Sequence, residues 1–142
     1  VDGGADILNK CGYIPDILIG DMDSVSDIGM YRSKELVLHA YENGKCPCLE
    51  RVRRLNIPYK VITITGTSED AALMLAYRKE AELIVLVGGH CCMYDFMRKG
   101  RAGMGSTLIT RLIVGDKLVD CKGINRLLTK ENIRKEFLWA KM

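Results

Sequence analysis

The sequence predicts an α/β domain with a doubly wound, Rossmann-like and mostly parallel sheet. Short aliphatic or β-branched runs alternate with helical patterns at close spacing, which is typical of βαβ units. The run at 82–89 is almost continuously apolar, and such runs indicate a parallel strand buried on both faces. Acidic residues and glycines follow several of these strands, at the sheet edge where α/β domains bind ligands.

Local signals place the individual elements. Gly12 ends the first helix, Asn43-Gly44 marks a turn, and Thr67 stands three residues before Asp70 as in a capping box. The expected strands cover 16–19, 35–40, 59–65, 82–89 and 117–121. The expected helices cover 5–11, 24–32, 49–55, 67–79, 92–99, 103–114 and 130–142.

Composition limits the class of protein. The 142 residues suffice for one domain, and 48% hydrophobic with 27% charged residues is ordinary for a soluble globular protein. A net charge of +3 without a basic block argues against nucleic acid as a partner. The six cysteines, at 11, 46, 48, 91, 92 and 121, lack zinc-binding spacing and are expected to be reduced thiols. We expect an α/β domain at 1–128, with its first strand preceding Val1, and a charged helix or pre-anchor segment at 129–142.

The stretch at 15–24, Pro-Asp-Ile-Leu-Ile-Gly-Asp-Met-Asp-Ser, carries the central chemical signal. Extended backbone turns alternate side chains the same way, so Asp21 and Asp23 would present two carboxylates at the end of a strand. Adjacent carboxylates repel unless a cation lies between them, and Mg²⁺ suits one or two carboxylates together with phosphate oxygens. The alternative is an Asx-rich turn in which Asp23 or Ser24 caps the next helix.

Three other segments would reach the same edge of the sheet. Asp2-Gly3-Gly4 ends the implied first strand, Thr67-Ser68-Glu69-Asp70 opens a helix directly after a strand, and Gly88-Gly89-His90 follows the most apolar strand. Glycines allow backbone to approach a ligand, and a helix N-terminus with hydroxyls suits phosphate. The alternative is that these residues only cap helices or form loops.

The segment 99–107 is a further candidate, because it combines glycines, two cations and a Ser-Thr helix start. Such backbone can form a phosphate cradle, although the segment lacks the Lys-Ser/Thr ending of a Walker loop. The alternative is a flexible turn between helices. The residues of this candidate cradle are Arg101, Gly103, Gly105, Ser106 and Thr107.

These motifs resemble the catalytic domain of thiamin pyrophosphokinase. That family carries Asp-Gly-Gly, as at 2–4, and Pro-Asp-x-x-x-Gly-Asp-x-Asp-Ser, as at 15–24. Its Thr-Asp is replaced by Glu69-Asp70, and the arginine expected shortly after Gly88-Gly89 is absent. The family's C-terminal β-sandwich is also expected to be absent, because too few residues follow Lys117 to form one.

The resemblance implies a domain that binds ATP with Mg²⁺ and transfers pyrophosphate to the hydroxyl of thiamin or a related small alcohol. It implies catalytic roles for Asp21, Asp23 and Asp70, with the first two binding the metal. The nucleotide-binding residues it implies are Asp2, Gly3, Gly4, Gly20, Ser24, Thr67, Ser68, Gly88, Gly89 and His90.

The chain also resembles, over most of its length, the SteA-type bacterial proteins, which are described as membrane-anchored or cytokinetic-ring proteins. The matching segments are 1–6, 19–27, 66–70, 99–107, 115–120 and 122–123. This resemblance implies a cytoplasmic domain of a membrane-anchored protein with envelope or division proteins as partners, and the related kinases imply a homodimer. Three functions stay open: a nucleotide- and Mg²⁺-binding domain, an active pyrophosphokinase, and a non-catalytic interaction scaffold.

Overall fold

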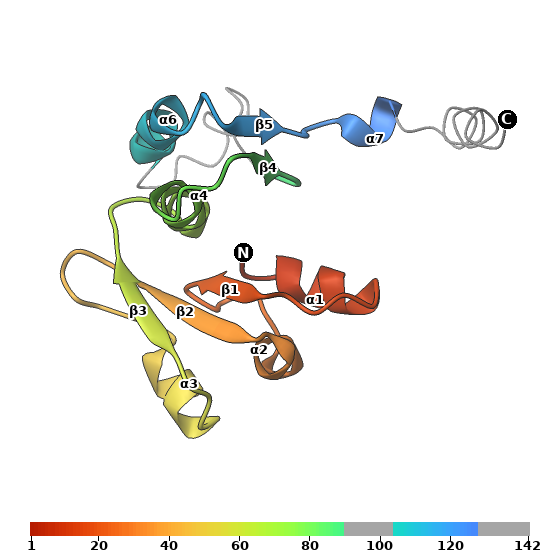
Figure 1. The fold of residues 1–142 in the computed structure, drawn as a ribbon. Helices are drawn as coiled ribbons and strands as arrows, with labels where there is room; N and C mark the ends of the chain where they lie inside the picture. The colour runs from red at the N-terminus through yellow and green to blue at the C-terminus, as the bar shows by residue number, and fades with distance from the viewer. Residues whose placement is uncertain (90–103, 128–142) are drawn as a thin grey trace, which may run out of the picture.

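The computed structural model describes residues 1–89 and 104–127, which form an α/β fold with two parallel sheets (Figure 1). In chain order the elements are α1 (Gly4–Lys10), β1 (Ile17–Gly20), α2 (Asp27–Arg32), β2 (Glu35–Ala40), α3 (Leu49–Arg54), β3 (Lys60–Thr63), α4 (Ser68–Arg78), β4 (Ile84–Leu86), α6 (Met104–Ile113), β5 (Leu118–Asp120) and α7 (Ile124–Leu127).

The larger sheet has the order β1-β2-β3, and each neighbouring pair is parallel. Both faces of β1 and β2 are covered, because their alternate side chains enter two different clusters, whereas β3 is mostly exposed. Leu18, Leu36 and Leu38 pack with Val52 of α3 on one face. On the other face the apolar side chains of β1 and β2 pack with Ala71 of α4. The result is a three-layer arrangement in which the β1-α2-β2 and β2-α3-β3 connections keep their strands parallel.

Helix α4 connects the larger sheet to the smaller one. One side of α4 packs on β1 and β2, whereas Leu73 packs with Ile84 of β4 and with Val114, which follows α6. The smaller sheet is the parallel pair β4-β5, and α4 lies between the two sheets in Figure 1. The helix therefore holds the carboxyl end of β1 in a fixed relation to the N-terminus of α6.

The expected fold class is confirmed in part, because the described elements form an α/β structure whose strands pair in parallel, compatible with a Rossmann-like class. The described strands form two sheets, in which β4 hydrogen-bonds with β5 and not with β1, β2 or β3. A second expectation about the sheet is wrong for the described residues. The apolar run at 82–89 yields a strand of only three residues, and it is not buried on both faces. Val85 is 52% exposed and Val87 is 71% exposed, since no described layer covers that side.

Other expected elements appear with small shifts. The strand expected at 59–65 is shorter, and the helix expected at 24–32 begins at Asp27, because Ser26 and not Ser24 is its N-cap. The capping box at Thr67 is confirmed, with both reciprocal hydrogen bonds present. The helices expected at 92–99 and 130–142 lie outside the described residues.

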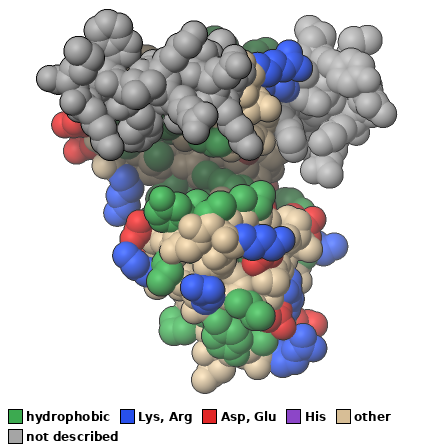
Figure 2. All heavy atoms as spheres, turned by 90° about the vertical axis from the view of Figure 1, so that its right-hand side faces the viewer, with side chains coloured by type: hydrophobic (Ala, Val, Ile, Leu, Met, Phe, Trp, Pro, Cys, Tyr) green, Lys and Arg blue, Asp and Glu red, His purple; other side chains and the backbone are tan. Residues whose placement is uncertain are grey.

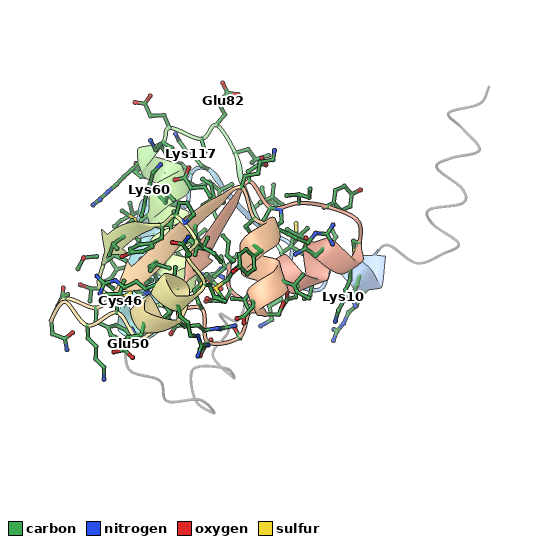
Figure 3. The ribbon with its side chains drawn as sticks, turned by 90° about the horizontal axis from the view of Figure 1, so that it is seen from below. Lys10, Cys46, Glu50, Lys60, Glu82 and Lys117 are labelled. Atoms are coloured by element: carbon green, nitrogen blue, oxygen red, sulfur yellow. The ribbon has the colours of Figure 1, made fainter. Side chains whose placement is uncertain are left out.

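The described surface is mixed in character. Figure 2 shows basic, acidic and apolar side chains interspersed below the grey atoms. Figure 3 places Cys46 and Glu50 at the α3 end of the molecule and Lys10 of α1 toward the opposite side. None of the helices in the described parts has the length and apolar character that a bilayer crossing requires.

Candidate functional site

Three aspartates meet at the carboxyl end of β1. Asp2, Asp21 and Asp23 each offer a carboxylate oxygen, and these oxygens all lie within 4.8 Å of one another. Asp2 and Asp21 are half-buried, and Asp23 is exposed. No other such group of potential metal ligands occurs at 1–89 or 104–127. The sequence placed these three residues at one edge of the sheet, and the structure brings them together.

Asp2 is held by the strand it adjoins. Its backbone N–H donates to the carbonyl of Ile19 (3.1 Å), and its carboxylate accepts from the N–H of Met22 (3.0 Å). Gly20 leaves the space that the Asp2 carboxylate occupies, because a Cβ built on Gly20 would overlap it. Glycine at this position is therefore required by the approach of a carboxylate.

The geometry of the acidic pair differs from the expected extended backbone. Met22, between Asp21 and Asp23, has a φ of +59° and a side chain only 1% exposed. Its left-handed conformation is uncommon for a residue with a side chain, and burial in the core beneath β1 helps to hold it. The two carboxylates are thus brought together by a turn, in which the N–H of Asp23 donates to the Asp21 carboxylate (3.4 Å).

The proximity of the carboxylates changes their acidity. Burial raises the pKa of Asp2, and the neighbouring Asp21 raises it further. Burial also raises the pKa of Asp21, with a second contribution from Asp23, while the nearby His39 acts in the opposite direction. The pKa of Tyr41 is raised by burial and then by Asp21 and Asp23. The cluster is a site of negative charge that a cation would relieve.

The N-terminus of α4 lies against this cluster. Ser68 lies close enough to the Asp2 carboxylate for its side chain to lower the pKa of Asp2. Ser24, on the loop after β1, accepts a hydrogen bond from the N–H of Gly3 (3.4 Å). Thus Asp2, Gly3, Ser24 and Ser68, all expected to contact a nucleotide, share one neighbourhood with the acidic cluster.

Asp70 is fully buried one turn into α4. Its Oδ2 accepts from the N–H of Thr67 (2.7 Å), and from the hydroxyls of Thr67 (3.0 Å), Ser106 (3.3 Å) and Thr107 (3.0 Å). Its Oδ1 is buried without a hydrogen-bond partner among the described residues. Ser106 and Thr107 of the expected phosphate cradle therefore face Asp70. A Cβ built on the neighbouring Gly105 would contact no other atom within 4 Å.

The remaining expected site residues are less closely tied to the cluster. Gly88 is exposed with a φ of +75°, and Gly89 is buried against Leu86 and Arg111. No described contact joins either glycine to the acidic cluster. Gly4 begins α1 in open space. The expected contributions of His90, Arg101 and Gly103 fall outside the described residues.

Sequence reasoning missed two residues beside the cluster. His39 is buried in β2, with Nε2 2.9 Å from the carbonyl of Ile64, and it lies close enough to act on the charge of Asp21. Arg51 in α3 donates to the loop after β1, including the carbonyl of Met22. Arg51 stands in an arginine-rich run that looks like a solvated helix face, so the sequence carried no signal for its role.

The arrangement can hold a divalent cation. Its donors are carboxylate oxygens, which Mg²⁺ and Ca²⁺ prefer, and their half-exposed setting leaves room for water or phosphate oxygens. The thiols at 1–89 and 104–127 offer no comparable site, although Cys46 Sγ and Cys48 Sγ lie 3.6 Å apart. Burial and the neighbouring Cys46 raise the pKa of Cys48 to about 12, so it stays a neutral thiol.

Comparison with known proteins gave no relative. The chain matches no protein-family model, no curated protein and no solved structure.

Proposed function

We propose that this chain is a nucleotide-binding domain that uses Mg²⁺ to hold the phosphates of ATP. The supporting observation is the convergence of Asp2, Asp21 and Asp23 at the carboxyl end of β1. Open α/β sheets bind ligands at this edge, and a metal ion at a pair of carboxylates neutralises phosphate charge. The resemblance of the motifs to those of thiamin pyrophosphokinase indicates that the nucleotide is ATP and the metal is Mg²⁺.

In this proposal each part of the site has a distinct task. Asp21 and Asp23 bind the metal, and Asp2 adds a carboxylate and hydrogen-bonds the backbone between them. The N-terminus of α4, which begins at Ser68, lies next to them. The N–H groups of Thr67 and Asp70 are used by the capping box, so the N–H groups of Ser68 and Glu69 would bind a phosphate oxygen. Asp70 organises the start of α4 and the facing residues of α6. When bound, Mg²⁺ would supply charge neutralisation and fix the orientation of the phosphates.

Manganese provides a direct test of the metal site. Mn²⁺ resembles Mg²⁺ in its preference for oxygen ligands and is visible by electron paramagnetic resonance. We expect the protein to bind Mn²⁺, Mg²⁺ to displace it, and the variants Asp21→Ala and Asp23→Ala to lose binding. Asp116→Ala, which removes an exposed carboxylate outside the cluster, is the matched control. Unchanged Mn²⁺ affinity in both cluster variants would show that the metal site is assigned to the wrong residues.

Catalysis is a second proposal on the same site. Transfer of pyrophosphate from ATP to a small alcohol such as thiamin converts ATP to AMP, and it depends mainly on positioning and charge neutralisation. Formation of AMP that requires both thiamin and Mg²⁺ would establish turnover. Nucleotide binding without AMP formation for any tested alcohol would leave a binding domain.

An interaction scaffold is the candidate that the apolar surface favours. Leu108, Ile109 and Leu112 of α6 are each at least 60% exposed, as is Val87 beyond β4. Exposed apolar side chains in such numbers are typical of protein contacts. A homodimer, and partners among envelope or division proteins of a membrane-anchored bacterial protein, are the corresponding proposals. Sedimentation of the protein at several concentrations would separate a dimer from a monomer.

A further inference from the structure

Arg51 joins α3 to the loop that carries the acidic cluster. Its Nη1 donates to the carbonyl of Met22 (2.7 Å), and its Nη2 donates to the carbonyl of Val25 (2.9 Å). Its Nε donates to the carboxylate of Asp27 (2.9 Å), which also forms an ion pair with Nη2 (2.5 Å). One planar guanidinium thus spans the loop from its acidic end to the first residue of α2.

The backbone of α3 at Arg51 is held in place by core packing. The next residue, Val52, is fully buried in the cluster beneath the larger sheet, which fixes α3 on that face. The Arg51 side chain is 31% exposed, so its contacts with the loop are partly shielded from water. Hydrogen bonds from a charged donor in such a setting are stronger than those between neutral groups, so the loop is held firmly.

Arg51 acts on the residue that sets the distance between the two metal-binding carboxylates. The peptide groups flanking Met22 are held on both sides, because its N–H donates to Asp2 and its carbonyl accepts from Arg51. The left-handed backbone of Met22 is less favourable than the ordinary conformations of a residue with a side chain. Without Arg51 the loop can relax toward those conformations, and the spacing of Asp21 and Asp23 is no longer fixed.

We propose that Arg51 is a positioning residue for the acidic cluster and that it sets the preference of the cluster for Mg²⁺ over Ca²⁺. This inference rests on the proposed function, since it assumes that the cluster binds a divalent cation. Mg²⁺ requires short distances and near-ideal octahedral geometry, whereas Ca²⁺ accepts longer distances and irregular sets of oxygens. Because Mg²⁺ tolerates less departure from its preferred geometry than Ca²⁺ does, loosening the loop should weaken Mg²⁺ binding more than Ca²⁺ binding.

The test compares the affinities for Mg²⁺ and Ca²⁺, each measured by displacement of Mn²⁺. Arg51→Met keeps the apolar stem but removes every donor, and we expect Mg²⁺ affinity to fall about tenfold while Ca²⁺ affinity changes less. The lysine of Arg51→Lys can donate to one acceptor but cannot span three. Its ratio of Mg²⁺ affinity to Ca²⁺ affinity should therefore lie between those of the wild type and Arg51→Met. Arg54→Met, at an exposed position of the same helix, should leave both affinities unchanged.

The outcomes separate this inference from the proposed function. If the wild-type protein binds neither ion, the proposed function fails and this inference fails with it. If the wild type binds Mg²⁺ but the ratio is the same in Arg51→Met, the positioning role alone is wrong. An equal loss for both ions would show a general effect on folding and would also overturn the role. Should Arg51→Met unfold by circular dichroism, the ratio in Arg51→Lys decides the question.

Discussion

Replacing Asp21 by asparagine should stabilise the metal-free protein and abolish its stabilisation by Mg²⁺. Burial and Asp23 raise the pKa of Asp21 above its ordinary value of 3.8. As pH rises past that value, the unfolded chain ionises first, so this carboxylate lowers the free energy of unfolding at neutral pH. The asparagine side chain does not ionise, and the variant should therefore be more stable than the wild type above the raised pKa. Below the ordinary pKa of aspartate, the variant and the wild type should have the same free energy of unfolding.

The size of the effect follows from the geometry of the cluster. Two unit charges about 4 Å apart repel by about 1 kcal/mol in water and about 4 kcal/mol near a protein surface. Asp23 is exposed and Asp21 only half-buried, so the value for water is the better guide. We therefore expect a gain of about 1–2 kcal/mol, which corresponds to a rise in melting temperature of about 3–6 °C for a chain of this length.

Thermal unfolding with and without Mg²⁺ measures both parts of this prediction. At about a hundredfold excess over its dissociation constant, Mg²⁺ should stabilise the wild type by about 2.7 kcal/mol and should leave Asp21→Asn unchanged. Asp116→Asn serves as the control, since it removes an exposed carboxylate outside the cluster. The reasoning is refuted if metal-free Asp21→Asn is less stable than the wild type at neutral pH, or if Mg²⁺ stabilises both equally.

Three other substitutions or reactions test parts of the site. Asp70→Asn should cost about 2–4 kcal/mol by thermal unfolding, because the buried carboxylate accepts four hydrogen bonds; a change below about 0.5 kcal/mol would contradict this role. Gly20→Ala should displace the Asp2 carboxylate and weaken Mn²⁺ binding about tenfold or more, and unchanged affinity would show that Asp2 is not needed there. Brief alkylation at neutral pH followed by mass spectrometry should modify the exposed Cys11 and leave Cys48 intact, because its pKa is about 12; rapid labelling of Cys48 would show that it is accessible and ionised.

Much of the local structure could be predicted from the sequence, because it depends on signals within a few residues. The capping box at Thr67 and the end of α1 before Gly12 depend on neighbouring residues alone. The β-branched strands and their parallel pairing followed from alternation with helices. The meeting of Asp2 with Asp21 and Asp23 followed from the rule that parallel strands end at the same edge.

The features that could not be predicted depend on contacts between distant segments. Met22 is left-handed because Asp2 and Arg51 hold its peptide groups from two other elements. The apolar run at 82–89 could not reveal that β4 pairs only with β5 among the described strands, which leaves Val85 exposed. An apolar run indicates which residues can be buried, but the layers that cover them are set by the whole fold.

The most direct test of the central claim is calorimetric titration of the protein with ATP in the presence and absence of Mg²⁺. The account predicts binding that depends on Mg²⁺ and is lost in the double variant Asp21→Asn, Asp23→Asn. Binding that is the same without Mg²⁺ or in the double variant would contradict the assignment of the acidic cluster. Absence of binding to ATP, GTP and their diphosphates would contradict nucleotide binding altogether and would favour the interaction scaffold.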